Sequence, residues 1–214
     1  MVSPVAARLS LSPGILVTCL MVMGLLVGGC IERYEFNGRE VSEESIAYDI
    51  VGVDTDNRPF RLSDHLGQYV LLNFGYTFCP DVCPLTLADL SRSYTQLLQE
   101  ESISAEDIIV VFVTIDPERD TLDKLGPYVH AFHSDFYGVY IEDGAEMEAM
   151  LKAYNITVRK RYRPADDGSV TYLVDHSAGV HVINSNGVER LFFPYNLGAE
   201  EMAADLSHLL NKES

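Results

Sequence analysis

The stretch Val70-Leu-Leu-Asn-Phe-Gly-Tyr-Thr-Phe-Cys79-Pro-Asp-Val-Cys83-Pro-Leu-Thr-Leu-Ala-Asp-Leu90 decides the fold of this chain. Its first five residues form a short apolar run closed by Gly75, a pattern typical of a buried central strand. Residues 85–100 then place apolar side chains at helical spacing: Leu87, Leu90, Tyr94, Leu97 and Leu98. The stretch therefore predicts a strand, a turn with two cysteines, and a helix.

Similar patterns extend outward from this stretch in both directions. Residues 108–115 are rich in β-branched side chains and end at Asp116-Pro117, which predicts a second buried strand. We expect further strands at 47–53 and 60–62, helices at 121–132, 145–154 and 198–210, and hairpins at 158–174 and 179–193. The turns of these hairpins fall at Asp166-Asp167-Gly168 and Asn186-Gly187. This order of elements predicts a layered α/β domain.

The composition excludes several classes of function. The 214 residues include 15 Lys and Arg against 32 Asp and Glu, a formal charge of -17, and 47% are hydrophobic. Such an acidic chain can bury a core but lacks the basic surface that nucleic acid requires. Its charge suits a cationic partner. The chain contains no Gly-x-Ser-x-Gly, His-Glu-x-x-His or phosphate-binding glycine loop, which argues against hydrolysis.

The N-terminus has the pattern of an export signal. Arg8 precedes the uncharged run 14–29, which as a helix would span about 24 Å, less than the roughly 30 Å of a bilayer core. This length favours a secretory signal, with an uncleaved membrane anchor as the alternative. We therefore expect a signal peptide or anchor at 1–29, a polar tether at 30–46 and a folded domain at 47–214.

Cys79 and Cys83 carry the candidate chemistry. The i, i+4 spacing across a helix start puts both sulfurs on one face, where the helix N-terminus favours thiolates. Thiolates are soft ligands that suit cuprous copper or zinc. A structural disulfide closing a small loop and a redox dithiol are the alternatives, although redox motifs of the thioredoxin type use Cys-x-x-Cys. The residues alone leave these three possibilities open.

Three blocks together resemble a known family. They are residues 74–84, which include the cysteine pair; residues 114–121, Thr-Ile-Asp-Pro-Glu-Arg-Asp-Thr; and residues 174–179, Val-Asp-His-Ser-Ala-Gly. In this order and spacing they resemble the Sco/SenC proteins, copper-binding factors for assembly of the CuA centre of cytochrome c oxidase. The resemblance runs from about Tyr48 to Leu210. Val27-Gly-Gly-Cys30 in turn resembles the lipobox of bacterial lipoproteins, in which Cys30 would carry the lipid.

The resemblance implies a thioredoxin-like three-layer fold with a central mixed sheet, helices on both faces and an additional β-hairpin. It also implies a copper site formed by Cys79, Cys83 and His176, and three ligands leave a position open for exchange. We expect Asp175 to orient the His176 ring, with a surface aspartate at the end of a strand as the alternative, and Asp81 to modulate the charge between the cysteines. We expect Asp116 and Asp120 to border the site and serve partner docking, with Asp120 or Thr121 as a helix N-cap.

These expectations define a metallochaperone that passes copper to the CuA-bearing subunit II of cytochrome c oxidase. A thiol–disulfide oxidoreductase that keeps the copper-site cysteines of the oxidase reduced is the alternative, with Cys79 and Cys83 as its catalytic dithiol. A peroxidase-like relative is a third, weaker option. An upstream copper donor or a thiol reductant would be a further partner. A lipid or an N-terminal anchor would hold the domain at a membrane, on the extracytoplasmic side of a bacterium.

Overall fold

The computed structural model describes residues 33–41, 45–164 and 170–213. The predicted signal or anchor at 1–29, Cys30 and the hairpin turn at 166–168 lie outside these ranges. Residues from Phe36 onward form one compact unit. Within the described ranges, none of the helices has the length and hydrophobicity needed to cross a bilayer.

The centre of the domain is an eight-stranded sheet in the order β1-β10-β9-β4-β5-β6-β2-β3. Strands β4, β5 and β6 run parallel, whereas β9 joins β4 and β2 joins β6 in antiparallel pairs, so the sheet is mixed as predicted. Every residue of β4 and β5 is buried, which explains their continuous apolar sequence. The strands span β1 Arg39–Glu40, β2 Val51–Asp54, β3 Pro59–Arg61, β4 Tyr69–Gly75, β5 Ile108–Thr114, β6 Tyr137–Tyr140, β9 Gly179–Ile183 and β10 Glu189–Pro194.

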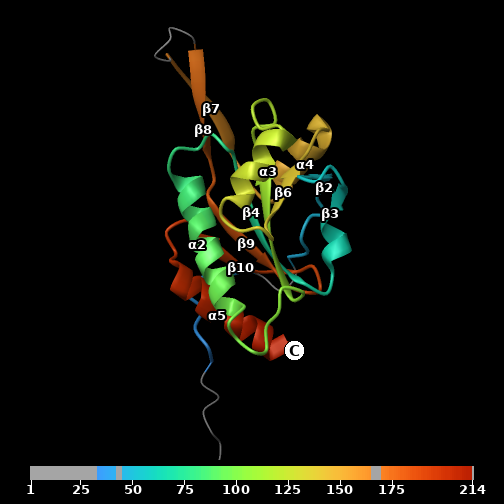
Figure 1. Cartoon of the computed structure of the whole chain (residues 1–214), viewed down its shortest axis with the longest axis vertical. Coiled ribbons are helices and arrows are strands. Elements are labelled where there is room, and N and C mark those ends of the chain that lie inside the picture. The colour runs from blue at the N-terminus through green and yellow to red at the C-terminus, as the bar shows by residue number, and fades with distance from the viewer. Residues whose placement is uncertain (1–32, 42–44, 165–169, 214) are drawn as a thin grey trace, which may run out of the picture. The chain divides into compact units, whose positions relative to one another are not determined.

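Helices cover both faces of this sheet, as predicted. Phe74 packs its ring against Tyr154 at the end of α4, while the next residue, Gly75, lies against Cys83 in α2. Because successive strand residues point to opposite faces, α2 and α4 lie on opposite sides of β4. Helix α5 packs beside α2 (Figure 1). The helices are η1 Leu62–His65, α2 Val82–Leu97, α3 Leu122–His130, α4 Gly144–Ala153 and α5 Ala199–Glu213.

A second, two-stranded sheet forms the additional hairpin. Strands β7 Val158–Pro164 and β8 Val170–His176 pair only with each other among the described residues. The hairpin projects beyond the central sheet near the start of α2, at the end of the domain away from α5 (Figure 1). Since β8 ends at His176, the hairpin brings that residue to the helix start that carries the cysteines.

The folded domain begins earlier than the sequence predicts. Within the expected tether 30–46, Arg39 and Glu40 form β1 and pair with Phe192 and Leu191 of β10. The backbone N–H groups of Asn37 and Gly38 donate to Asp205 at 3.1 and 2.8 Å, and Asp205 is buried in α5. A buried carboxylate requires such donors, so this polar segment is part of the domain rather than a spacer.

Candidate metal centre

The two cysteines lie where the buried strand passes into the first long helix. Strand β4 ends at Gly75, Cys79 lies in the turn, and Cys83 is the second residue of α2. Both are free thiols, Cys83 buried and Cys79 half-buried. A Cβ atom at Gly75 would lie 3.0 Å from the Cys83 sulfur and 2.7 Å from the Phe112 ring, so only glycine lets this sulfur pack against the strand.

His176 approaches this sulfur from the second sheet. Its Nε2 atom lies 3.6 Å from Cys83 Sγ, although 93 residues separate the two in sequence. Its Nδ1 atom lies 2.7 Å from the carbonyl oxygen of Ser177, which can only accept a hydrogen bond. Nδ1 therefore carries the proton, and the Nε2 lone pair faces the cysteine.

The two thiols are electrostatically unequal. Hydrogen bonds from the Cys83 thiol and from the backbone N–H groups of Asp81 and Cys83, together with the nearby His176 ring, outweigh burial and lower the pKa of Cys79 to about 3. The pKa of Cys83 is raised because its proton bonds to Cys79, because it is buried, and because the Cys79 thiolate is close. At neutral pH the pair therefore holds one thiolate and one buried thiol.

The spacing of sulfur and nitrogen fits two ligands of one soft ion. A tetrahedral ion bound about 2.3 Å from sulfur and about 2.0 Å from nitrogen separates those atoms by roughly 3.6 Å. The part of the chain that the structure describes contains no group of three His, Cys, Asp or Glu side chains already in place around an ion. The third ligand that the family resemblance implies is Cys79, which is half-buried and whose sulfur accepts the Cys83 backbone N–H at 3.4 Å.

Three buried side-chain atoms in the described residues have no hydrogen-bond partner: Asn73 Oδ1, Arg119 Nη2 and Tyr128 Oη. Asn73 belongs to β4, two residues before Gly75. The pKa of Tyr128 is raised by burial and then by the charges on Cys83 and Cys79, so this tyrosine also lies near the cysteines. Buried unpaired polar atoms are uncommon, and here they belong to the segments around the cysteine pair.

The acidic side chains of the second block are internal, which corrects the prediction that Asp116 and Asp120 serve docking. Both are buried, and Asp120 accepts hydrogen bonds from Thr77 N at 2.9 Å, Thr77 Oγ1 at 2.6 Å and Thr114 Oγ1 at 2.6 Å. It therefore connects the cysteine turn to β5. The N-cap of α3 is Thr121, whose side chain makes no capping hydrogen bond.

Asp175 and Asp81 also differ from expectation. Asp175 Oδ2 forms an ion pair with Arg161 Nε at 2.7 Å, and the carbonyl of Ser177 orients the His176 ring instead. Asp81 occupies the N-cap position of α2 without a side-chain capping bond. It acts on the site through its backbone N–H, which stabilises the Cys79 thiolate.

Arg119, Tyr76 and Tyr172 are site residues that the sequence reasoning missed. Arg119 donates from Nε to Asp116 Oδ2 at 2.6 Å and from Nη1 to the Tyr172 carbonyl at 2.8 Å. Tyr76 Oη accepts from Val174 N at 3.2 Å and its ring packs edge-on against His176. A signal was present for Arg119, which is the one cation in the acidic block 116–121.

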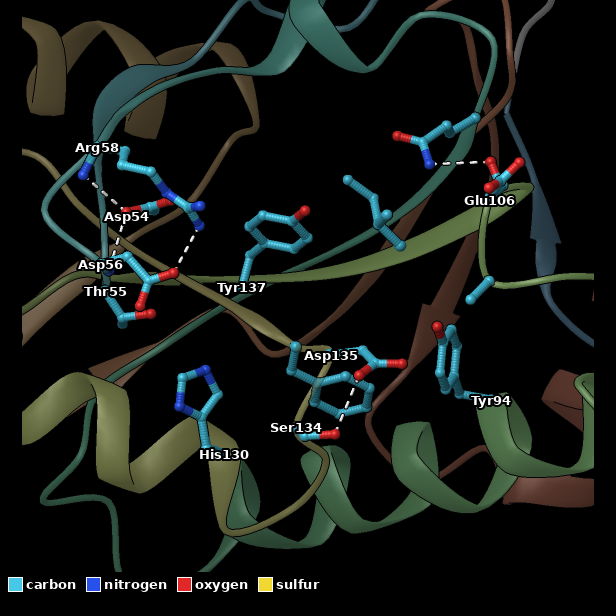
Figure 2. Close-up of a pocket in the computed structure, with 14 residues that line it drawn as sticks. Asp54, Thr55, Asp56, Arg58, Tyr94, Glu106, His130, Ser134, Asp135 and Tyr137 are labelled. Atoms are coloured by element: carbon cyan, nitrogen blue, oxygen red, sulfur yellow. Dashed lines mark hydrogen bonds and ion pairs between the residues drawn. The ribbon is translucent and has the colours of Figure 1, made fainter.

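A polar cavity of about 370 Å³ lies away from the cysteines and His176, and Figure 2 shows the residues that line it. It lies between the β2–β3 turn, the end of α3 and the start of β6, and none of the predicted copper ligands lines it. Arg58 pairs with Asp54 and Asp56 at its rim (Figure 2). The cavity is therefore separate from the cysteine site.

Fold and site together define a class: thioredoxin-like α/β domains with a dithiol at the first long helix. A thioredoxin domain of a thiol–disulfide oxidoreductase from Bacteroides vulgatus shares the fold, with a TM-score of 0.56, 16% identity, and coverage of 80% of this chain and 99% of that one. Within this class, the chain belongs to the SCO1/SenC family, whose model matches residues 39–211.

Individual relatives agree with this assignment. Protein SCO1 homolog 2, mitochondrial, of Arabidopsis thaliana is 36% identical over 162 residues, 75% of this chain and 54% of that protein. The solution structure of apo Sco1 from Thermus thermophilus has a TM-score of 0.69 at 30% identity, covering 83% of this chain and 99% of that one. ScoI of Bradyrhizobium japonicum, solved with copper bound, has a TM-score of 0.65 at 29% identity, with coverages of 76% and 98%. This chain spans about half the length of the first curated relatives it matches.

Proposed function

We propose that this protein binds copper through Cys79, Cys83 and His176 and delivers it to the CuA-bearing subunit II of cytochrome c oxidase. The observation that carries the proposal is the 3.6 Å contact between His176 Nε2 and Cys83 Sγ, with Nδ1 held by the Ser177 carbonyl. Two soft sulfurs and an imidazole suit cuprous copper and also hold the cupric ion. The copper-bound relative from Bradyrhizobium japonicum supports the same cargo.

Each ligand has a distinct role in this proposal. The Cys79 thiolate supplies the initial charge, because its pKa of about 3 keeps it ionised at neutral pH. The buried Cys83 thiol gives up its proton when the cation arrives, so binding releases a proton. His176 offers its lone pair from a separate sheet, and a three-ligand site leaves a position through which an acceptor cysteine can exchange.

The tether and the partners belong to the same proposal. A lipid on Cys30, or an uncleaved anchor within residues 1–29, would hold the domain at the extracytoplasmic face of a bacterial membrane. Copper would arrive from an upstream donor, and a thiol reductant would keep the pair in the reduced state that binds it. Mass spectrometry of the membrane-bound form distinguishes a lipidated Cys30 from an intact N-terminus.

A competition titration with a cuprous chelator tests the proposal. We expect the reduced domain to bind one Cu(I), the Cys79→Ser/Cys83→Ser variant to bind none, and His176→Ala to bind at least tenfold more weakly. His130→Ala is the matched control, because His130 is exposed and lines the separate cavity. Equal affinity of wild type and the double serine variant would refute the site.

The unequal thiols support thiol–disulfide exchange as a second candidate function. The Cys79 thiolate would attack a disulfide of the oxidase and form a mixed disulfide. Cys83, once deprotonated, would attack Cys79 and release the substrate thiol. The substrate gains two electrons from the pair, one proton from Cys83 and one from solvent, while Cys79 and Cys83 become a disulfide. A thiol reductant would then restore the pair. Slower exchange in His176→Ala would favour this function, whereas unchanged exchange with lost copper affinity would favour copper delivery alone.

A further inference from the structure

Arg119 lies between the cysteine turn and strand β8, and the proposed function does not yet use it. Its Nε atom donates to Asp116 Oδ2 at 2.6 Å and its Nη1 atom to the Tyr172 carbonyl at 2.8 Å. The Asp116 side chain is 0% exposed and the Arg119 side chain 18%. A buried carboxylate needs a paired cation or several hydrogen-bond donors, and Asp116 has the Arg119 guanidinium, so these contacts fix the guanidinium in place.

Three aromatic rings, two from the cysteine turn and one from β8, lie around the guanidinium of Arg119. Its central carbon lies 3.6 Å from the ring centroid of Tyr172, 4.8 Å from that of Phe78 and 5.7 Å from that of Tyr76. Within the described residues its buried Nη2 atom has no hydrogen-bond partner. Cation–π attraction to the faces of these rings stabilises the buried charge instead. Tyr76 and Phe78 precede Cys79, whereas Tyr172 belongs to β8. One side chain therefore joins the segment that carries a cysteine to the strand that carries the histidine.

Strand β8 places Tyr172, which contacts Arg119, on the same face as His176. Tyr172, Val174 and His176 are alternate residues of the strand and lie on the same face. The Tyr172 hydroxyl donates to Asp116 Oδ1 at 2.8 Å, and Val174 N donates to Tyr76 Oη at 3.2 Å. Because β8 pairs only with β7 in the described sheets, side-chain contacts of this kind hold the strand against the domain.

We propose that Arg119 is a positioning residue of the copper site, which holds β8 so that His176 Nε2 stays beside Cys83 Sγ. It would act on copper affinity only through His176 and would never touch the ion. That effect rests on the proposed copper function, whereas the effect on the histidine position does not. Loss of a residue that orients a metal ligand typically costs about 10–100-fold in affinity.

The first test uses the reduced, metal-free protein. We expect a nuclear Overhauser contact between the His176 ring and the Cys83 β-protons in wild type, and its loss in Arg119→Met. Arg58→Met is the matched control: Arg58 Nε also donates to a buried aspartate, Asp54, at 3.0 Å, at the rim of the separate cavity (Figure 2). An unchanged contact in Arg119→Met, or its loss in Arg58→Met as well, would overturn the proposal.

The second test is a double-mutant cycle of Cu(I) affinity. We expect Arg119→Met to lose about 10–100-fold, and Arg119→Met/His176→Ala to bind no more weakly than His176→Ala alone. Additive losses, or wild-type affinity of Arg119→Met, would contradict action through the histidine. If wild type binds no copper, the proposed function fails, and the metal-free test still decides the role of Arg119.

Two conservative variants apply if Arg119→Met does not fold. Arg119→Lys keeps a cation for Asp116 but lacks the planar fork that reaches the Tyr172 carbonyl and stacks on its ring. Tyr172→Phe keeps the ring and removes only its hydrogen bond to Asp116. We expect both to unfold as cooperatively as wild type on heating and to weaken the His176–Cys83 contact and the copper affinity in part. Wild-type values for both variants would refute the proposal.

Discussion

Cys79 and Cys83 are four residues apart and yet have opposite acid–base properties. The sulfur of Cys79 lies in the turn and receives the Cys83 backbone N–H at 3.4 Å, whereas Cys83 lies within the helix and is buried. Backbone donors and a neighbouring thiol stabilise the anion at the first position, and burial beside that anion stabilises the proton at the second. The reactive sulfur of this pair is therefore Cys79.

This asymmetry predicts the pH dependence of alkylation. Because the pKa of Cys79 is about 3, its thiolate fraction is constant above that value, and iodoacetamide should modify it at a nearly flat rate between about pH 5 and pH 8. Cys83→Ala removes the largest stabilising hydrogen bond. The pKa of Cys79 should then rise, and the rate should climb with pH. Mass spectrometry of quenched samples measures both, and a steep profile in wild type would contradict the assignment.

Some site residues could be predicted from the sequence pattern, and others could not. The spacing and the proline-flanked turn were enough to place Cys79 and Cys83 together. His176 lies 93 residues after Cys83 in a separate sheet, so only the resemblance to a family pointed to it. The contacts of Asp116, Asp120 and Asp175 could not be predicted, because the sequence does not show whether a carboxylate faces solvent, buried hydroxyls or an arginine distant in the chain.

At the scale of elements, the segment after β5 holds the site together. Asp120 fixes the cysteine turn through Thr77 and strand β5 through Thr114. Asp116 and Arg119, in the same segment, hold strand β8. The middle sequence block thus contacts the cysteine turn on one side and, through Tyr172, the strand that ends in His176 on the other.

Replacing Asp120 should therefore destabilise the domain. Asp120→Ala leaves the Thr77 N–H, the half-buried Thr77 hydroxyl and the buried Thr114 hydroxyl without their acceptor, and we expect a loss of about 2–3 kcal/mol in the free energy of unfolding. Asp81→Ala is the control, since Asp81 is exposed and its side chain caps nothing, and a change within about 0.5 kcal/mol is expected. Urea unfolding followed by circular dichroism measures both. Equal effects of the two substitutions would exclude the bridging role of Asp120.

Long elements were predictable, whereas among the short strands β3 was predicted at 60–62 and β1 and β6 were not. Strands β4 and β5 and helices α2 to α5 were predicted within a few residues, because a run of buried apolar residues or an amphipathic period specifies each. Strand β6 has four residues and β1 has two, too few to show a period, and backbone pairing with a neighbour creates them. Strand β2 likewise begins at Val51 and not at the predicted residue 47. Its pairing with β3 starts at Val51 and its pairing with β6 at Val53.

At the scale of the molecule, the proposed ligands join two sheets. The cysteines follow the central sheet and His176 ends the hairpin, so a bound ion would cross-link segments far apart in the chain. Binding to the folded state alone raises the free energy of unfolding by mass action. The closed loop is long, and linking distant residues also restricts the unfolded chain.

Copper should accordingly raise thermal stability. With free Cu(I) about 1,000-fold above its dissociation constant, the reduced domain should gain roughly 4 kcal/mol, visible as a higher melting temperature in calorimetry. Cys79→Ser/Cys83→Ser should show no gain under the same buffered copper. A similar gain in that variant would mean that copper stabilises the domain from another location.

The separation of the hairpin from the central sheet has a consequence for recognition. Contacts of Arg119, Tyr172 and Tyr76 that involve no ion already hold this two-stranded hairpin against the domain. Under the proposed function, a bound ion would add one further link through His176, and its release would remove that link and leave the others. An acceptor would therefore meet a hairpin that is already in place.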